Sequence, residues 1–482
     1  MNLIQDSENS TLIEVEKGRN YSNELVGNSP ETDFIIMEKE NLLSYENISL
    51  GILLLIFTHS QLCRQIMYYF SDFSFDAKPT YAMNADLHFN KEEYATLASY
   101  GFTLFFVLAS LLAGAFSDRY NRPMIIVISC FSWSILTLLQ GYVGLFSELL
   151  ILRAGIGISQ AFLNPAAYSI ISEIFPSTYV GTANSIYSTG IYLGGGMASL
   201  SIQLDQLLGW RKSLITMGIL GIVLAIIAKF YLRDPRTILF SLRSTTNSNN
   251  NANNINNNNT NPLSSISLKD NLRDIVEIMK DRQVQFLLLA STFRFFAGFT
   301  ISIWKAPFIF NKFPHHSNEF AHYNAIVITI GGLISSLLGG YLSDYLHHSR
   351  RNFPLARTWI PAVSSFLAIP FWWIFLKHSS LTWSLIALFW EYFFAECWIG
   401  PTLTALLGAI PKSKKGFVQG IFAFLTAIGN FGPLIMPWLI HGNYFSMEDA
   451  LLMMVGLSYF ISGLIFLAAA NEEQKILDSS NY

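Results

Sequence analysis

Long apolar stretches separated by short polar ones recur along almost the whole chain. Each is about 20 residues long and carries few charges, the length that an α-helix needs to cross a ~30 Å hydrocarbon core. We predict twelve such spans, at residues 48–70, 94–116, 124–143, 149–171, 183–204, 213–232, 284–306, 320–342, 359–376, 383–407, 416–439 and 450–470. The pattern therefore predicts an all-α membrane protein with twelve transmembrane helices in two groups of six.

The polar stretches divide the chain into parts. We expect a disordered cytosolic tail (1–46), a six-helix bundle (47–232), an Asn-rich cytosolic linker (233–266), an amphipathic helix (267–282), a second six-helix bundle (283–470) and a second cytosolic tail (471–482). The tract 247–261 is almost entirely Asn and cannot bury apolar area. Residues 267–282 carry an apolar stripe opposite charges, which favours a helix on the membrane surface over a merely solvated one.

Lys and Arg gather after the second, sixth, eighth and tenth spans. Because cytoplasmic loops carry this excess, we place both termini in the cytosol. Residues 8–13 and 38–43 resemble acidic dileucine sorting signals. They favour a lysosomal or vacuolar membrane, with the plasma membrane as the second choice.

Composition excludes several classes of protein. Of the 482 residues, 51% are hydrophobic and 13% are charged, whereas a soluble domain carries about 25% charged residues. A net charge of -3 offers no basic field for nucleic acid. All three cysteines lie inside apolar stretches, which indicates neither a metal site nor a disulfide framework. We expect no enzyme activity and no cofactor.

One motif occurs after both the second and the eighth span. It comprises Gly114, Asp118, Arg119 and Arg122 in the first copy, and Gly340, Asp344 and Arg350 in the second. The duplication resembles the major facilitator superfamily, which implies a carrier with a central site and alternating access. By this resemblance Asp118, Arg119 and Arg122 latch the cytosolic side, with Asp344 and Arg350 as a weaker copy. The alternative is that these residues only obey the positive-inside rule.

The fourth span narrows the resemblance. Its sequence from Arg153 through paired glycines, Gln160, Asn164 and Tyr168 to Pro176 resembles the spinster family, as do residues 233–236, 398–401 and 429–433. Members of that family move amphipathic lipids such as lysophospholipids and sphingoid phosphates. Relatives with sugar-like or organic-anion substrates share the scaffold.

Two positions depart from the spinster pattern. Cys63 and Gln160 stand where the family has acids, whereas the arginines Arg64 and Arg153 are retained. The anion-binding charge is thus kept while the usual proton carriers are lost, which favours a uniporter driven by the substrate gradient. If transport is coupled to protons, the candidate carriers are His59, Glu391 and Glu396.

Polar side chains inside spans are costly, so each is a functional candidate. The substrate-binding candidates are Gln61, Arg64, Arg153, Gln160, Asn164, Tyr168, Arg294, Glu391 and Glu396. Two alternatives stay open: Arg153 only braces backbone carbonyls, and Glu391 and Glu396 only form static ion pairs, either with Arg294 or with groups on the cytosolic side. The two glutamates are about 140° apart on an α-helix, so at most one is expected to point at the cavity.

Three functions fit this pattern. The first is a carrier for an anionic amphipathic lipid such as a lysophospholipid, and the second is a facilitator for a small polar solute such as a sugar or organic anion. The third is a non-transporting receptor, which a duplicated latch disfavours. We expect the protein to contact membrane lipids, to bind no nucleic acid and to function as a monomer. Few amides lie in the spans, which favours the lipid.

Overall fold

The computed structural model describes residues 30–74, 82–176, 179–234, 280–348, 353–410, 415–441 and 445–480. The side chains of Asp118 and of the predicted sorting signals lie outside this description, as do the Asn-rich tract and most of the predicted interfacial helix. The chain forms two compact units, Met1–Gly51 and Ile52–Tyr482. In the first unit the described residues are helical from Pro30 onward. The second unit holds the helices that build the site.

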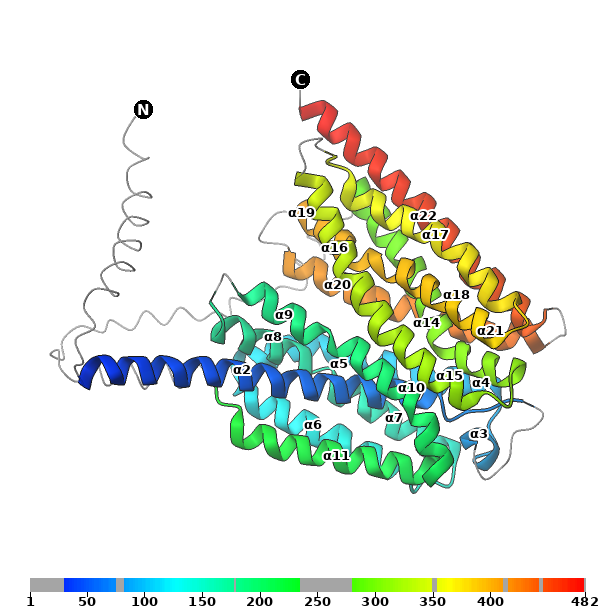
Figure 1. The fold of residues 1–482 in the computed structure, drawn as a ribbon, viewed down its shortest axis with the longest axis horizontal. Helices are drawn as coiled ribbons and strands as arrows, with labels where there is room; N and C mark the ends of the chain where they lie inside the picture. The colour runs from blue at the N-terminus through cyan, green and yellow to red at the C-terminus, as the bar shows by residue number, and fades with distance from the viewer. Residues whose placement is uncertain are drawn as a thin grey trace. The chain divides into compact units, whose positions relative to one another are not determined.

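The first six predicted spans are helical (Figure 1). Their elements, with two short helices between the first and second spans, are α2 (Pro30–Gln65), the 3₁₀ turn η1 (Ile66–Tyr68), α3 (Met83–Asp86), α4 (Lys91–Ala98), α5 (Tyr100–Arg119), α6 (Arg122–Gln140), α7 (Phe146–Gln160), α8 (Leu163–Ile174), α9 (Val180–Ser188), α10 (Gly190–Leu208) and α11 (Trp210–Tyr231).

The last six predicted spans are helical as well. Their elements are α14 (Arg282–Lys312), α15 (Ser317–Ile326), the π-helical turn η2 (Val327–Gly331), α16 (Gly332–His348), α17 (Ala356–Lys377), α18 (Leu381–Ala395), the 3₁₀ turn η3 (Glu396–Trp398), α19 (Ile399–Gly408), α20 (Lys415–Gly429), α21 (Gly432–His441) and α22 (Met447–Ser480).

The predicted fold class is confirmed. Within the described ranges, nine helical stretches are long and apolar enough to cross a membrane. The predicted spans 94–116, 183–204 and 383–407 are not among these nine, although they too are largely helical. The described part of the chain contains no strand.

Several spans are interrupted rather than continuous, and prolines explain three of the breaks. A proline lacks the N–H that would bond to the carbonyl four residues earlier, so the helix weakens there. Pro165 lies four residues after Ala161, where α7 gives way to α8. Pro401 lies four residues after Cys397, in the middle of η3, and Pro433 lies four residues after the last residue of α20.

The two six-helix groups contact along α10 and α15, which lie side by side in Figure 1. The Asn324 Nδ2 donates to the Tyr69 hydroxyl (3.1 Å) and to Ser199 Oγ (2.8 Å). The Tyr94 hydroxyl donates to the Ile303 carbonyl (2.8 Å). By their order along the spans, these residues lie near the helix ends opposite the Lys- and Arg-rich loops.

Candidate functional site

A cavity of about 410 Å³ is lined by residues from the first and the second half of the chain. Its polar lining includes Gln61, Arg64, Gln65, Tyr68, Asn164, Tyr192, Arg294, Ser302, Glu391, Tyr392, Glu396, Thr426 and Tyr459. The aromatic remainder includes Phe57, Phe106, Phe295, Phe299 and Trp398. Six of the nine predicted substrate-binding residues therefore face one space, contributed by both halves of the chain.

Arg64 is the cation that the first half contributes to the cavity. Its guanidinium lies over the Phe102 ring at 4.7 Å and near the Phe106 and Phe299 rings, each at 5.8 Å. It forms no ion pair with a described residue, and its side chain is partly exposed. A partly exposed cation held by aromatic faces is available to an anionic ligand.

Arg153 and Gln160 do not line the cavity. The buried Arg153 guanidinium donates to the Cys63 carbonyl (3.0 Å) and to the Arg64 carbonyl. Gln160 Nε2 donates to the Ser60 carbonyl (3.1 Å). Both side chains thus bond to the backbone of α2 near its C-terminal end. For Arg153 this agrees with the alternative that it only braces backbone carbonyls.

Asn164 and Tyr168 lie on α8 in different surroundings. Asn164 lines the cavity and accepts a hydrogen bond from the Tyr187 hydroxyl (2.8 Å). Tyr168 is exposed, and its hydroxyl lies 3.3 Å from Ser188 Oγ. Only the first of the two is placed to touch a ligand in this cavity.

Arg294 on α14 belongs to the wall from the second half. Its side chain is 4% exposed, and its guanidinium packs over the Tyr459 ring at 4.3 Å. Nη2 donates to the Ala395 carbonyl. The Nε and Nη1 atoms have no hydrogen-bond partner among the described residues.

Glu391 and Glu396 complete this wall. The fully buried Glu391 accepts a 2.6 Å hydrogen bond from the Tyr459 hydroxyl through Oε1, and its Oε2 has no described partner. Glu396 Oε2 lies 3.4 Å from the Tyr192 hydroxyl of the first half. In the described part of the chain, neither carboxylate forms an ion pair with Arg294, so the static pair that we considered is absent.

Both glutamates line the cavity, whereas helical periodicity allows only one of them to point there. Glu391 lies near the end of α18, and Glu396 begins the 3₁₀ turn η3 directly after it. The cavity reaches both side chains, so the expectation that at most one of them points there is wrong.

The structure places His59 away from the cavity. Its buried ring accepts from Trp133 Nε1 (3.2 Å) and donates to the Met217 carbonyl (3.0 Å), between α6 and α11. Of the three proton-coupling candidates, only the two glutamates line the cavity.

The predicted gating residues are only partly described. Arg122 is buried and pairs with Glu173 at 2.5 Å. Asp344 pairs with Arg357 at 3.0 Å, and Arg119 is exposed. The Asp118 side chain and Arg350 lie outside the described residues. The latch therefore stays a prediction.

The sequence analysis did not predict Tyr459 as a site residue. Its ring packs against the Arg294 guanidinium, and its hydroxyl donates to Glu391. The residue lies in the last span, among small and apolar residues of α22. A tyrosine in an apolar span usually packs or sits at the interface, so no local signal marks its role.

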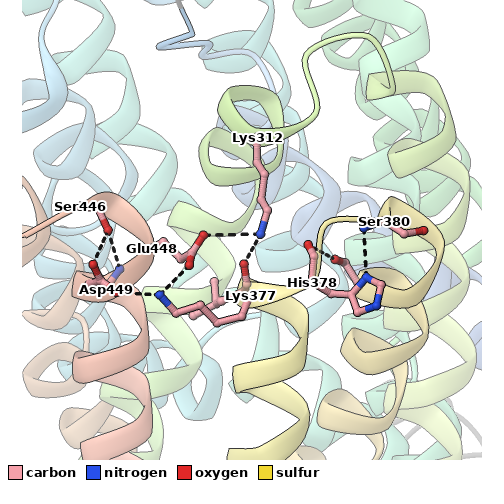
Figure 2. Close-up of polar contacts among 9 residues, drawn as sticks. Lys312, Lys377, His378, Ser380, Ser446, Glu448 and Asp449 are labelled. Carbon is pink, nitrogen blue, oxygen red and sulfur yellow. Dashed lines mark hydrogen bonds and ion pairs between the residues drawn. The ribbon is translucent and has the colours of Figure 1, made fainter.

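A second charged group joins the ends of α14, α17 and α22, and Figure 2 shows its contacts. Lys377 Nζ pairs with Glu448 (2.7 Å) and Asp449 (2.8 Å), and Lys312 Nζ lies 3.4 Å from Glu448. Ser446 and Asp449 bond reciprocally at the start of α22. None of these residues lines the cavity, so the group serves to hold three helix ends together.

Comparisons with known proteins agree with this geometry. The family model described as Major Facilitator Superfamily matches residues 63–433. A probable galactarate/D-glucarate transporter of Escherichia coli (strain K12) is 26% identical over 402 residues, covering 78% of this chain and 84% of that protein. Its counterpart in Bacillus subtilis (strain 168) is 24% identical over 352 residues, covering 70% and 74%.

Among solved structures, a bacterial homologue of the human lysosomal transporter Spinster, inward-facing and unoccupied, is similar in fold. The TM-score is 0.67 at 22% identity, covering 89% of this chain and 96% of that one. The predicted resemblance to spinster proteins is thus confirmed at the level of the fold. With a charged cavity that residues from both halves of the chain line, and a family match over residues 63–433, the chain belongs to the major facilitator superfamily.

Proposed function

We propose that the protein carries a small polar organic anion, such as a sugar acid, across the membrane by alternating access. The observation that carries this proposal is Arg64, a cation in the cavity with no ion pair among the described residues. A buried or half-buried cation needs an anionic partner, and a substrate carboxylate would supply one. The names of the two relatives above, both probable galactarate/D-glucarate transporters, support the same class of substrate.

The comparisons favour this small-solute alternative over the lysophospholipid that the sequence analysis puts first. The feature that would suit an acyl chain is the aromatic part of the lining, such as Phe57, Phe106 and Phe295. A lysophospholipid therefore belongs in the test as a competing ligand.

Alternating access requires the contacts between the two halves to break. In the predicted orientation, the hydrogen bonds of Asn324 and Tyr94 lie at the end that faces away from the cytosol. We propose that this conformation is closed at that end. The cytosolic placement of both termini and the lysosomal or vacuolar membrane stay predictions.

The test is uptake by purified protein in liposomes. We expect saturable uptake of radiolabelled galactonate or galactarate, with no competition from the anionic lysolipid lysophosphatidylglycerol below its micellar concentration. Protein-free liposomes are the control. Uptake of neither acid would overturn the proposal, and protein-dependent movement of the lysolipid would then support the lipid carrier instead.

The same vesicles test energy coupling. Because Cys63 and Gln160 replace the usual acids, we expect an imposed pH gradient to drive no accumulation at equal substrate concentrations on both sides. Accumulation that is lost in Glu391→Gln or Glu396→Gln would instead identify a proton carrier.

A further inference from the structure

The two walls of the cavity differ in formal charge. The first half contributes Arg64. The guanidinium of Arg153 does not line the cavity and donates its hydrogen bonds to backbone carbonyls. The second half contributes Arg294 together with Glu391 and Glu396, and the buried Lys305 Nζ lies 5.4 Å from the ring of the lining residue Tyr392. In formal charges the lining residues of the first half sum to +1 and those of the second half to -1, and the buried Lys305, which does not line the cavity, offsets the second sum.

The wall from the second half offers hydrogen-bond donors and acceptors side by side. Arg294 Nε and Nη1 carry three N–H groups without a described partner, and Glu391 Oε2 is an acceptor without one. Both side chains are more than nine-tenths buried and line the cavity. Unpaired groups of both kinds at one place are costly unless a ligand satisfies them.

Hydroxyl groups fit this wall better than a carboxylate does. A hydroxyl both donates and accepts, so it can bond to Glu391 and to Arg294 at once. A carboxylate only accepts, and at this wall it would meet two other carboxylates, Glu391 and Glu396. Such like-charge contacts reject a ligand even where other contacts attract it.

We propose that the cavity selects a polyhydroxylated monocarboxylate over a dicarboxylate of the same length. Its carboxylate lies at Arg64, and its hydroxylated end lies against Arg294 and Glu391. This inference rests on the proposed function, since it assigns an orientation and a charge to the same organic anion. It distinguishes this chain from the two relatives described above, which are named for the dicarboxylates galactarate and glucarate.

The test compares galactonate with galactarate, which have the same six-carbon skeleton and differ in the group at one end. In the wild-type protein we expect kcat/KM for galactonate uptake to exceed that for galactarate by about tenfold or more, because the second carboxylate meets like charge at short range. In Glu391→Gln this ratio should fall several-fold, as the repulsion is removed and galactonate loses an acceptor.

Glu319→Gln serves as the matched control, because Glu319 is exposed on α15 and does not line the cavity. Its ratio should equal that of the wild type. Monodisperse elution in detergent shows that a variant is folded, and Glu396→Gln provides a second variant if Glu391→Gln is not.

The outcomes separate the two proposals. A wild-type ratio near one, or a preference for galactarate, overturns this inference and leaves the proposed function standing. A ratio that is unchanged in folded Glu391→Gln and Glu396→Gln overturns it as well. If neither galactonate nor galactarate shows saturable uptake, both proposals are overturned.

Discussion

Arg64 and Arg153 carry the same charge but have different roles, and their hydrogen bonds decide which is which. Arg153 bonds to the carbonyls of Cys63 and Arg64, which lie in the last turn of α2 and lack helical partners. Inside a membrane such carbonyls must be satisfied by protein. Arg153 is thus a positioning residue that holds the backbone of Arg64, while the Arg64 guanidinium lies over Phe102 and faces the cavity.

We predict that Arg64→Gln raises the KM for sugar-acid uptake by roughly tenfold or more, since a charge-assisted hydrogen bond contributes about 1.5–3 kcal/mol. Arg64→Lys should lose less, because the charge remains although the planar group does not. Transport kinetics in proteoliposomes provide the measurement. Arg282→Gln, a change at an exposed arginine that begins α14, should leave KM unaltered. An unchanged KM in Arg64→Gln would remove Arg64 from the site.

At the scale of the helix, prolines leave backbone carbonyls without their intrahelical hydrogen bond, and side chains of other helices donate to these carbonyls instead. Pro307 removes the intrahelical bond to the Ile303 carbonyl, and the Tyr94 hydroxyl of α4 donates to that carbonyl instead. Pro437 in α21 likewise leaves the Pro433 carbonyl without its intrahelical bond. This carbonyl accepts a hydrogen bond from Trp304 Nε1 (3.0 Å). The breaks in these helices therefore become contacts between helices.

Glycines set how closely the helices approach. A Cβ added at Gly194 on α10 would lie 2.5 Å from the Thr58 carbonyl oxygen of α2, too close for a real contact. A Cβ at Gly456 on α22 would meet nothing within 4 Å. The packing of α10 on α2 thus depends on the missing side chain, whereas Gly456 has no such constraint.

We predict that Gly194→Ala destabilises the protein by about 1–3 kcal/mol, because the helices must move apart. Gly456→Ala, the matched control, should be neutral or slightly stabilising, because Ala favours the helix over Gly by about 1 kcal/mol. Thermal unfolding in detergent compares the two variants. Equal melting temperatures would show that α10 and α2 can separate without cost.

For the molecule as a whole, a few buried polar contacts hold the two halves together at one end. Asn324 is fully buried and bonds to Tyr69 and Ser199, both in the other half. These groups are uncharged, and water can replace their hydrogen bonds when the interface opens, at a net cost of about 0.5–1.5 kcal/mol for each bond. Contacts of this kind suit an interface that opens and closes in every transport cycle.

We predict that Asn324→Ala shifts the population toward the state open at this end, by roughly tenfold for each 1.4 kcal/mol of lost contact. Ser302→Cys, which lines the cavity, reports the shift through labelling by an impermeant thiol reagent added from either side. Cys397→Ser removes the native thiol that is not fully buried. Ser317→Ala, at an exposed contact, is the control. If the labelling ratio does not change, Asn324 has no part in closing the cavity.

The sequence by itself determined the fold class and most of the cavity's chemistry. The length of the apolar stretches requires helices that cross a membrane, and the cost of burying charge marks Arg64, Arg294, Glu391 and Glu396 as functional. These inferences need only the local pattern, because helix length and residue polarity do not depend on what a helix packs against.

Only the tertiary structure decided which polar residues meet in the cavity. His59 and Arg64 share α2, yet one faces α6 and α11 while the other faces the cavity. Periodicity tells which residues share a face, but the rotation of each helix is set by its neighbours. Both glutamates line one cavity although they lie on different sides of their helix, and Tyr459 joins them from the last helix. Such contacts depend on packing between residues far apart in the chain, which no local pattern records.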